Sequence, residues 1–160
     1  MLSQQDRQAI DRLFQEMYQA WADNNAKRYA DCFEEDVDYV AFDGTHIKGR
    51  VANERLHATL LNGVLKGTRL EGGLVQLRPL TSDVVLAHAT GAVVFPWQTK
   101  MKKNRLSIQT LVLVKREGRW LAAAFQNTRV KPIATPEADS FIVRAFSAYA
   151  ALRRKLTPTP

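Results

Sequence analysis

The sequence has few of the residues from which metal centres and disulfide scaffolds are built. It contains one cysteine, Cys32, and three histidines among 160 residues. One cysteine excludes an internal disulfide and a multi-cysteine metal site, and it agrees with a reducing compartment. A site made by His46, His57 and His88 requires three separate segments to converge, so we expect no bound metal. Cys32 is expected to be buried filler, since no histidine partner for a thiol nucleophile is recognisable nearby.

Long hydrophobic runs are also absent. The longest uncharged apolar stretch, residues 84–97, is interrupted by His88 and Gly91 and is shorter than the roughly 20 residues of a membrane span. The first seven residues are polar and lack the apolar centre of a secretory signal. We therefore expect a cytoplasmic protein without a membrane partner. No G-x-G-x-x-G fingerprint occurs either, so no nicotinamide or flavin role is indicated and no cofactor is expected.

The chain carries a net charge of +7, but its composition is that of a folded protein, with 46% hydrophobic and 24% charged residues. The basic side chains gather mainly in a lysine-rich turn, residues 100–105, and in the tail, residues 153–155. No exposed aromatic residues are interleaved with them, as single-stranded nucleic-acid binding would require. We interpret the charge as a solvated positive surface and expect no nucleic-acid partner.

Helical spacing of apolar residues predicts a helix over residues 3–22, capped by Ser3. A polar turn then leads into a short helix over 26–33, and a third helix is predicted over 50–61. A last helix is predicted over 136–152, before a Pro-Thr-Pro tail that should be frayed. The first helix is identified by one apolar stripe, formed by Ile10, Leu13, Phe14, Met17, Tyr18 and Trp21.

Between and after these helices the pattern is typical of strands. Asp43-Gly44 predicts a hairpin turn between strands at 37–42 and 45–48, because glycine accepts the positive φ of tight turns. Residues 69–130 then predict a meander of four antiparallel strands, at 69–77, 84–95, 105–115 and 120–130. We predict an α+β protein with one domain over 1–130, on which the helix and frayed tail of 131–160 pack.

The order of these elements, with Trp21, the stretch Phe33–Val40 and the glycines Gly44 and Gly49, resembles the nuclear transport factor 2-like superfamily. Within it, residues 83–89 and 124–129 resemble the SgcJ/EcaC branch, close to SnoaL-like polyketide cyclases and ketosteroid isomerase. The resemblance implies a cone-shaped, curved antiparallel or mixed sheet wrapped around the N-terminal helices, with an extra C-terminal helix here. It also implies a pocket for a small hydrophobic molecule and a homodimer joined through sheet faces.

Matching each strand to the ketosteroid isomerase pattern implies which side chains line that pocket. Gln109 falls where that family carries a proton-donating aspartate. Because side chains alternate between the two faces of a strand, Ser107 and Leu111 then point to the same face as Gln109. On the preceding strand, the same matching implies that Leu86, His88, Thr90 and Ala92 point into the pocket. The other implied lining residues are Trp21, Tyr39, Ala41, His57, Ala123, Phe125 and Asn127.

The departures from the isomerase pattern limit what can be carried over. The general-base aspartate of that family falls on Ala41 and its first-helix tyrosine falls near Met17, so steroid isomerisation in that manner is not expected. His57 and His88 are the candidate acid–base residues, because imidazole titrates near neutrality; the alternative is that both are structural core histidines. Gln109 and Asn127 could donate hydrogen bonds to a carbonyl or enolate oxygen, or could simply bridge strands.

Three functions stay open at this point. The first is a cofactor-independent cyclase or isomerase acting on a hydrophobic, carbonyl-bearing ligand that resembles a polyketide or steroid. The second is a non-catalytic pocket that binds such a ligand. The third is a homodimeric assembly module, in which the last helix could extend the dimer surface.

Overall fold

The computed structural model describes residues 2–131, 137 and 140–156, without the side chain of Lys155. The chain divides into two compact units, Met1–Val130 and Lys131–Pro160. The second unit contains one helix, α4 (Phe141–Leu156). The first unit contains, in order, α1 (Gln4–Ala22), α2 (Ala26–Ala30), β1 (Phe33–Val40), β2 (His46–Lys48), α3 (Arg50–Asn62), β3 (Arg69–Pro79), β4 (Val84–Val94), the 3-10 helix η1 (Lys103–Arg105), β5 (Ser107–Arg116) and β6 (Arg119–Arg129).

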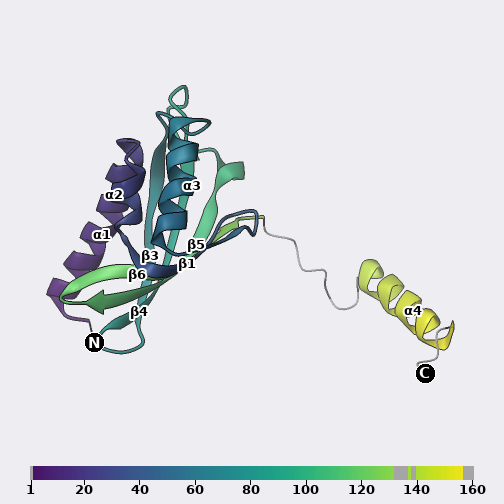
Figure 1. Cartoon of the computed structure of the whole chain (residues 1–160). Helices are drawn as coiled ribbons and strands as arrows, with labels where there is room; N and C mark the ends of the chain where they lie inside the picture. The colour runs from purple at the N-terminus through teal and green to yellow at the C-terminus, as the bar shows by residue number, and fades with distance from the viewer. Residues whose placement is uncertain (1, 132–136, 138–139, 157–160) are drawn as a thin grey trace. The chain divides into compact units, whose positions relative to one another are not determined.

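The six strands of the first unit form one mixed sheet in the order β2-β1-β6-β5-β4-β3. All neighbouring strands are antiparallel except β1 and β6, which run parallel. The sheet curves, and helices α1 to α3 lie against one of its sides (Figure 1). Its edge strands β2 and β3 do not pair with each other, so the sheet stays open. The predicted α+β class and curved sheet are confirmed, and no described helix is long and apolar enough to cross a membrane.

Helix α1 begins where the sequence predicts. The Ser3 side chain accepts a hydrogen bond from the backbone N–H of Asp6 at 3.0 Å, which satisfies one of the free donors of the first turn. Asp6 also joins this end of the helix to the sheet, because its carboxylate accepts from Lys115 Nζ at 2.8 Å and Trp120 Nε1 at 3.0 Å. These bonds hold the pKa of Asp6 well below its usual range.

Two glycines lie where the backbone geometry excludes a larger residue. Gly44, between β1 and β2, has a φ of +88°, as the predicted hairpin turn requires. Gly72 of β3 pairs with Gly91 of β4, and a Cβ at Gly72 would lie 2.0 Å from the carbonyl oxygen of Thr90. Only glycine fits at this position of the ladder, so Gly72 permits the close approach of the two strands.

The boundary between the second helix and the first strand was predicted wrongly. Helix α2 ends at Ala30, and Phe33 already belongs to β1. The reason is long-range pairing: Phe33 lies in register with Ala122 of β6, and the carbonyl of Cys32 accepts from the backbone N–H of Ala122 at 3.0 Å. Helix α4 runs beyond the predicted end at 152, while the predicted start at 136 and the tail 157–160 lie outside the described residues.

Candidate functional site

The register of the sheet decides which side chains face the helices. Directly paired residues on neighbouring strands point to the same face, and Gln109 pairs with Ala89 on one side and Asn127 on the other. Ala89 and Leu111 are fully buried in the core beneath the helices. Gln109 and Asn127 therefore lie on the same side as the helices, which we call the helix-covered face. The opposite side is the outer face.

His88 and Thr90 lie on the outer face, contrary to prediction. His88 pairs in register with Thr110, one residue out of step with Ala89 and Gln109. The Thr110 hydroxyl lies 3.2 Å from His88 Nδ1, and both side chains are half-buried. Leu86 and Ala92 share their strand's parity and face outward too. The inward positions of β4 are the small residues Ala87 and Ala89, which leave room for the helices packed above them.

The structure does not bring His57 and His88 together. His57 projects from α3 into the core on the helix-covered face, whereas His88 lies on the outer face of the sheet. The third histidine, His46, is exposed and lies 2.8 Å from the Asp38 carboxylate. Within the described part of the chain, no three His, Cys, Asp or Glu side chains gather as a metal site would need.

Around His57, aromatic rings fill the inner part of the helix-covered face. The His57 ring lies 4.5 Å from Tyr29 and 5.3 Å from Tyr39 between ring centroids, and Tyr39 stacks on Phe125 at 4.5 Å with planes 10° apart. Such contacts add to the stabilisation from buried area. We call this set the aromatic cluster; its members are Trp21, Tyr29, Phe33, Tyr39, His57 and Phe125.

The tautomer of His57 follows from its partners. Nδ1 lies 2.9 Å from the carbonyl oxygen of Asn53, which can only accept, so Nδ1 carries the proton. Nε2 is then an acceptor, and the Tyr39 hydroxyl lies 3.5 Å from it, at the outer limit of a hydrogen bond. Burial lowers the pKa of His57 to about 4, against a smaller opposite effect of the Asn53 carbonyl. The imidazole is therefore neutral at pH 7, with its lone pair directed at Tyr39.

Both tyrosines of the cluster are protonated under ordinary conditions. Burial raises the pKa of Tyr39 to about 12, with a small opposite effect from the Tyr29 hydroxyl. Burial also raises the pKa of Tyr29 well above its usual value. The interior thus holds neutral hydroxyl donors beside a neutral imidazole acceptor, which suits hydrogen bonding to an uncharged ligand or movement of a single proton.

Beside the aromatic cluster lies a pair of amides. The Gln109 side chain donates from Nε2 to Asn127 Oδ1 at 3.2 Å, and both side chains are half-buried. They stand two residues along their strands from Leu111 and Phe125, the next row on the same face. Ala41 follows the end of β1, two residues beyond Tyr39, and Ser107 is buried one row further along β5. The amides are therefore less buried than Leu111 on one side of their row and Ser107 on the other.

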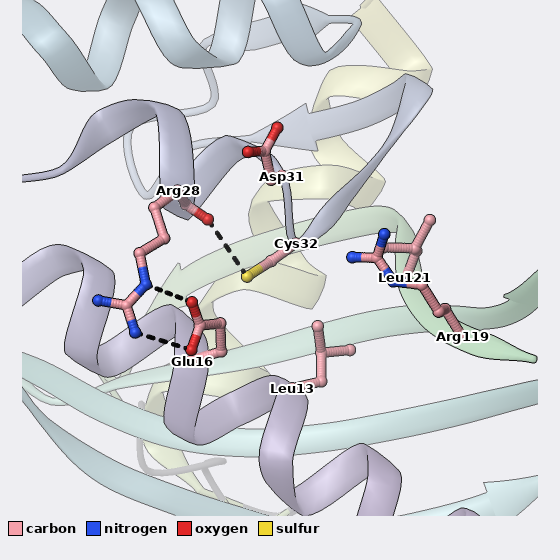
Figure 2. Close-up of a pocket in the computed structure, with 7 residues that line it drawn as sticks. All are labelled: Leu13, Glu16, Arg28, Asp31, Cys32, Arg119 and Leu121. Carbon is pink, nitrogen blue, oxygen red and sulfur yellow. Dashed lines mark hydrogen bonds and ion pairs between the residues drawn. The ribbon is translucent and has the colours of Figure 1, made fainter.

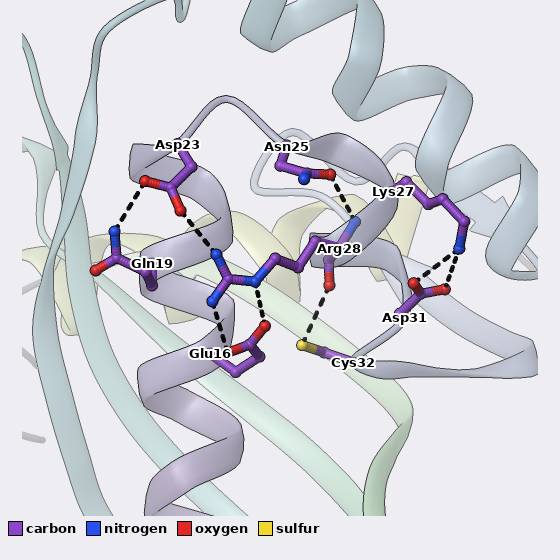
Figure 3. Close-up of polar contacts among 8 residues, drawn as sticks. All are labelled: Glu16, Gln19, Asp23, Asn25, Lys27, Arg28, Asp31 and Cys32. Atoms are coloured by element: carbon purple, nitrogen blue, oxygen red, sulfur yellow. Dashed lines mark hydrogen bonds and ion pairs between the residues drawn. The ribbon is translucent and has the colours of Figure 1, made fainter.

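A pocket of about 260 Å³ lies elsewhere, between α1, α2 and the start of β6 (Figure 2). Most of its charged side chains are paired: Arg28 contacts the carboxylates of Glu16 and Asp23, and Asp31 pairs with Lys27 (Figure 3). Its walls are Leu13, Glu16, Arg28, Asp31, Cys32, Arg119 and Leu121.

Cys32 is buried in the wall of that pocket, as predicted. Its thiol donates to the Arg28 carbonyl at 3.6 Å, and burial raises the pKa of Cys32 to about 12. A thiol with so high a pKa is a poor nucleophile.

Residues 10–124 match the SnoaL-like domain family. The chain belongs to this family. The predicted superfamily is thereby confirmed, and no curated protein matches the chain. A solved structure of unknown function with a cystatin-like fold from Nostoc punctiforme is 27% identical, with a TM-score of 0.76 over 97% of this chain and 99% of that one.

Two further structures are similar to this SnoaL-like chain. An uncharacterised protein with a cystatin-like fold from Caulobacter vibrioides is 29% identical, with a TM-score of 0.64 over 92% of this chain and 97% of the other. A putative scytalone dehydratase from Novosphingobium aromaticivorans is 14% identical, with a TM-score of 0.65 over 82% and 95%. At 14% identity the likeness concerns the fold alone.

Sequence reasoning did not predict that Asn53 of this SnoaL-like domain would be buried. Asn53 is fully buried on α3, and neither atom of its side-chain amide has a partner among the described residues. Helical spacing from His57 could have found it, because Asn53, His57 and Leu61 recur every four residues and form the buried stripe of α3. The apolar residue Val51 of the same helix is exposed instead.

Proposed function

We propose that the helix-covered face binds a flat, hydrophobic, carbonyl-bearing small molecule and acts on it as a cofactor-independent cyclase or isomerase. The observation that carries this proposal is the neutral His57, whose Nε2 lone pair faces the Tyr39 hydroxyl at 3.5 Å inside the aromatic cluster. The family and the aromatic surroundings favour an apolar ligand. The ligand would lie against Phe125 and the amides Gln109 and Asn127, which are all only partly buried, beside the buried aromatic cluster.

The chemistry is a proton transfer next to a carbonyl group. His57 Nε2 takes a proton from the carbon beside the ligand's carbonyl, and the C–H electron pair forms the enolate. The Asn127 amide nitrogen, which Gln109 leaves free to donate, holds the enolate oxygen by a hydrogen bond. The imidazolium then returns the proton to another carbon, or the enolate attacks a second carbonyl to close a ring and the new alkoxide takes the proton. No electrons are gained or lost overall.

The test compares two histidine variants on the two faces of the sheet. The wild-type chain is incubated with a panel of aryl-substituted β,γ-unsaturated ketones and 1,5-diketones, and consumption and product are followed by absorbance and mass spectrometry. His57→Gln and Tyr39→Phe should lose turnover by roughly 100-fold or more, as expected for loss of a general base or its partner. His88→Gln, on the outer face, should keep wild-type turnover. Undiminished turnover by a folded His57→Gln protein would contradict the proposal.

A second candidate function is ligand binding without reaction. It is favoured by Ala41, which stands where a base-bearing aspartate would be expected, and by a His57 whose low pKa of about 4 makes it a weak base. In that case a diketone from the panel would raise the melting temperature by mass action and be recovered intact. Recovery of a rearranged or cyclised product would exclude this candidate.

We also propose that the chain forms a homodimer through the outer face. Leu86, Val112 and Ala124 lie on this face and are only partly buried, and Ile108 is exposed beside them. An apolar sheet face of this kind is suited to pairing with its own copy. Light scattering should give twice the chain mass, and Val112→Arg should reduce it to one chain mass without unfolding. A monomeric wild-type chain would contradict this assembly.

A further inference from the structure

Helix α4 carries a stripe of large apolar side chains along one side. Its 16 residues include six such side chains, all between 56% and 84% exposed. At 3.6 residues per turn their positions fall within an arc of about 140°. The stripe is formed by Phe141, Ile142, Phe146, Tyr149, Leu152 and Leu156.

The charges on α4 are of one sign. Residues 141–156 contain four basic residues and no acidic residue. Arg144 and Arg154 flank the apolar stripe, about 60° and 80° beyond its two edges, while Arg153 falls within the arc, about 20° from one edge. A helix with an apolar face and cationic flanks is suited to lie in the plane of an anionic lipid surface, with its apolar side chains among the acyl chains.

Charge complementarity favours an anionic lipid surface over a second copy of the chain as the partner of α4. Residues 1–130 contain 18 basic and 14 acidic residues, a net charge of +4, so the first unit is itself positive. Residues 131–160 add 5 basic and 2 acidic residues, a net charge of +3. A second chain would therefore bring positive charge to a positive helix, whereas anionic lipid headgroups supply the missing negative charge.

We propose that α4 binds the surface of an anionic membrane through its apolar stripe. The helix would lie on the surface without crossing it, because 16 residues extend only about 24 Å and the hydrocarbon core is thicker. The expectation of no membrane partner was drawn from the lack of a spanning segment, and surface binding does not need one. The proposal is independent of the chemistry proposed for the helix-covered face.

The experiment is co-sedimentation of the full chain with lipid vesicles. Vesicles of phosphatidylcholine with 30% phosphatidylglycerol should bind the chain, on the order of tenfold or more tightly than pure phosphatidylcholine, and added salt should weaken the binding. Phe146→Glu should lower the affinity at least tenfold, because it removes an apolar anchor from the stripe. Ala151→Glu makes the same charge change about 150° from the centre of the stripe and should lower it by about fivefold or less.

Three results would overturn the proposal. The first is equal binding to both vesicle types, and the second is no binding to either. The third is concentration-dependent self-association that Phe146→Glu abolishes in the absence of lipid, which would assign the stripe to a second copy of the chain. Thermal unfolding of each variant should match the wild-type chain, which excludes loss of the fold as a cause.

Discussion

The two faces of one sheet treat the same kinds of side chain differently. On the helix-covered face, His57 and Tyr39 are buried among aromatic rings, and burial shifts the pKa of both away from its ordinary value. On the outer face, Asp38 pairs with His46 at 2.8 Å and Lys48 at 3.0 Å, and all three side chains are about half exposed. The difference shows that desolvation, more than residue type, decides where this protein can hold reactive neutral groups.

The largest contrast should appear when one apolar side chain is truncated on each face. Phe33 is fully buried within the aromatic cluster, so Phe33→Ala should lower the free energy of unfolding by about 3–5 kcal/mol. Ile108 is exposed on the outer face, and Ile108→Ala should cost less than about 1 kcal/mol. Chemical denaturation of both variants measures the two losses in free energy of unfolding. Similar losses would show that the outer face is covered in solution.

Acid should destabilise the protein because of the buried histidine on the helix-covered face. The pKa of His57 falls from 6.5 in the unfolded chain to about 4 in the fold, so the unfolded chain binds more protons between these values. Stability should therefore be complete above pH 6.5 and decline as the pH falls to 4, by on the order of 3 kcal/mol.

The control variants assign that decline to one histidine. Unfolding curves of His57→Gln should lose this part of the pH dependence, while those of His88→Gln should keep it. A His57→Gln protein whose stability still falls over the same pH range would place the titrating group elsewhere.

Removing one hydroxyl from each face should give a smaller contrast. Tyr39→Phe leaves His57 Nε2 without its hydroxyl neighbour inside the core and should cost about 1 kcal/mol. Thr110→Val removes the hydroxyl that contacts the half-buried His88 and should cost roughly half as much, because water can replace it. Denaturant unfolding measures the loss in free energy of unfolding for each variant. A larger loss for Thr110→Val than for Tyr39→Phe would contradict the greater burial of the helix-covered face.

The smallest effect is expected at Asp38. Its carboxylate is exposed, and hydrogen bonds from Lys48 and then His46 lower its pKa. Because solvent screens exposed ion pairs, Asp38→Asn should leave the unfolding midpoint at neutral pH nearly unchanged. A clear drop in the midpoint would mean that the outer face is less solvated than the single chain suggests.

Local signals predicted much of the fold. The apolar stripe and Ser3 cap of α1 and the Asp43-Gly44 turn depend on neighbours in sequence, and the structure has both. The end of α2 depends instead on the pairing of Phe33 with Ala122, which are far apart in sequence. No local pattern contains that information, so the short helix was predicted too long.

The candidate site was harder to predict because it depends on strand register. On β4, either alternate set, Leu86 with His88 or Ala87 with Ala89, is compatible with a strand, and the larger set was assigned inward. Packing under the helices selects the alanines, since they leave the space that the aromatic rings fill. Asn53 was missed for a related reason, since an asparagine on a helix is usually exposed.

The central claim is that His57 is a buried, neutral imidazole with its proton on Nδ1 and its unprotonated Nε2 facing the Tyr39 hydroxyl. Nitrogen-15 NMR of the imidazole across a pH titration measures both properties in the intact chain. The account predicts the Nδ1–H tautomer, unchanged until the pH approaches about 4. A midpoint near 6.5, or a proton on Nε2, would contradict it.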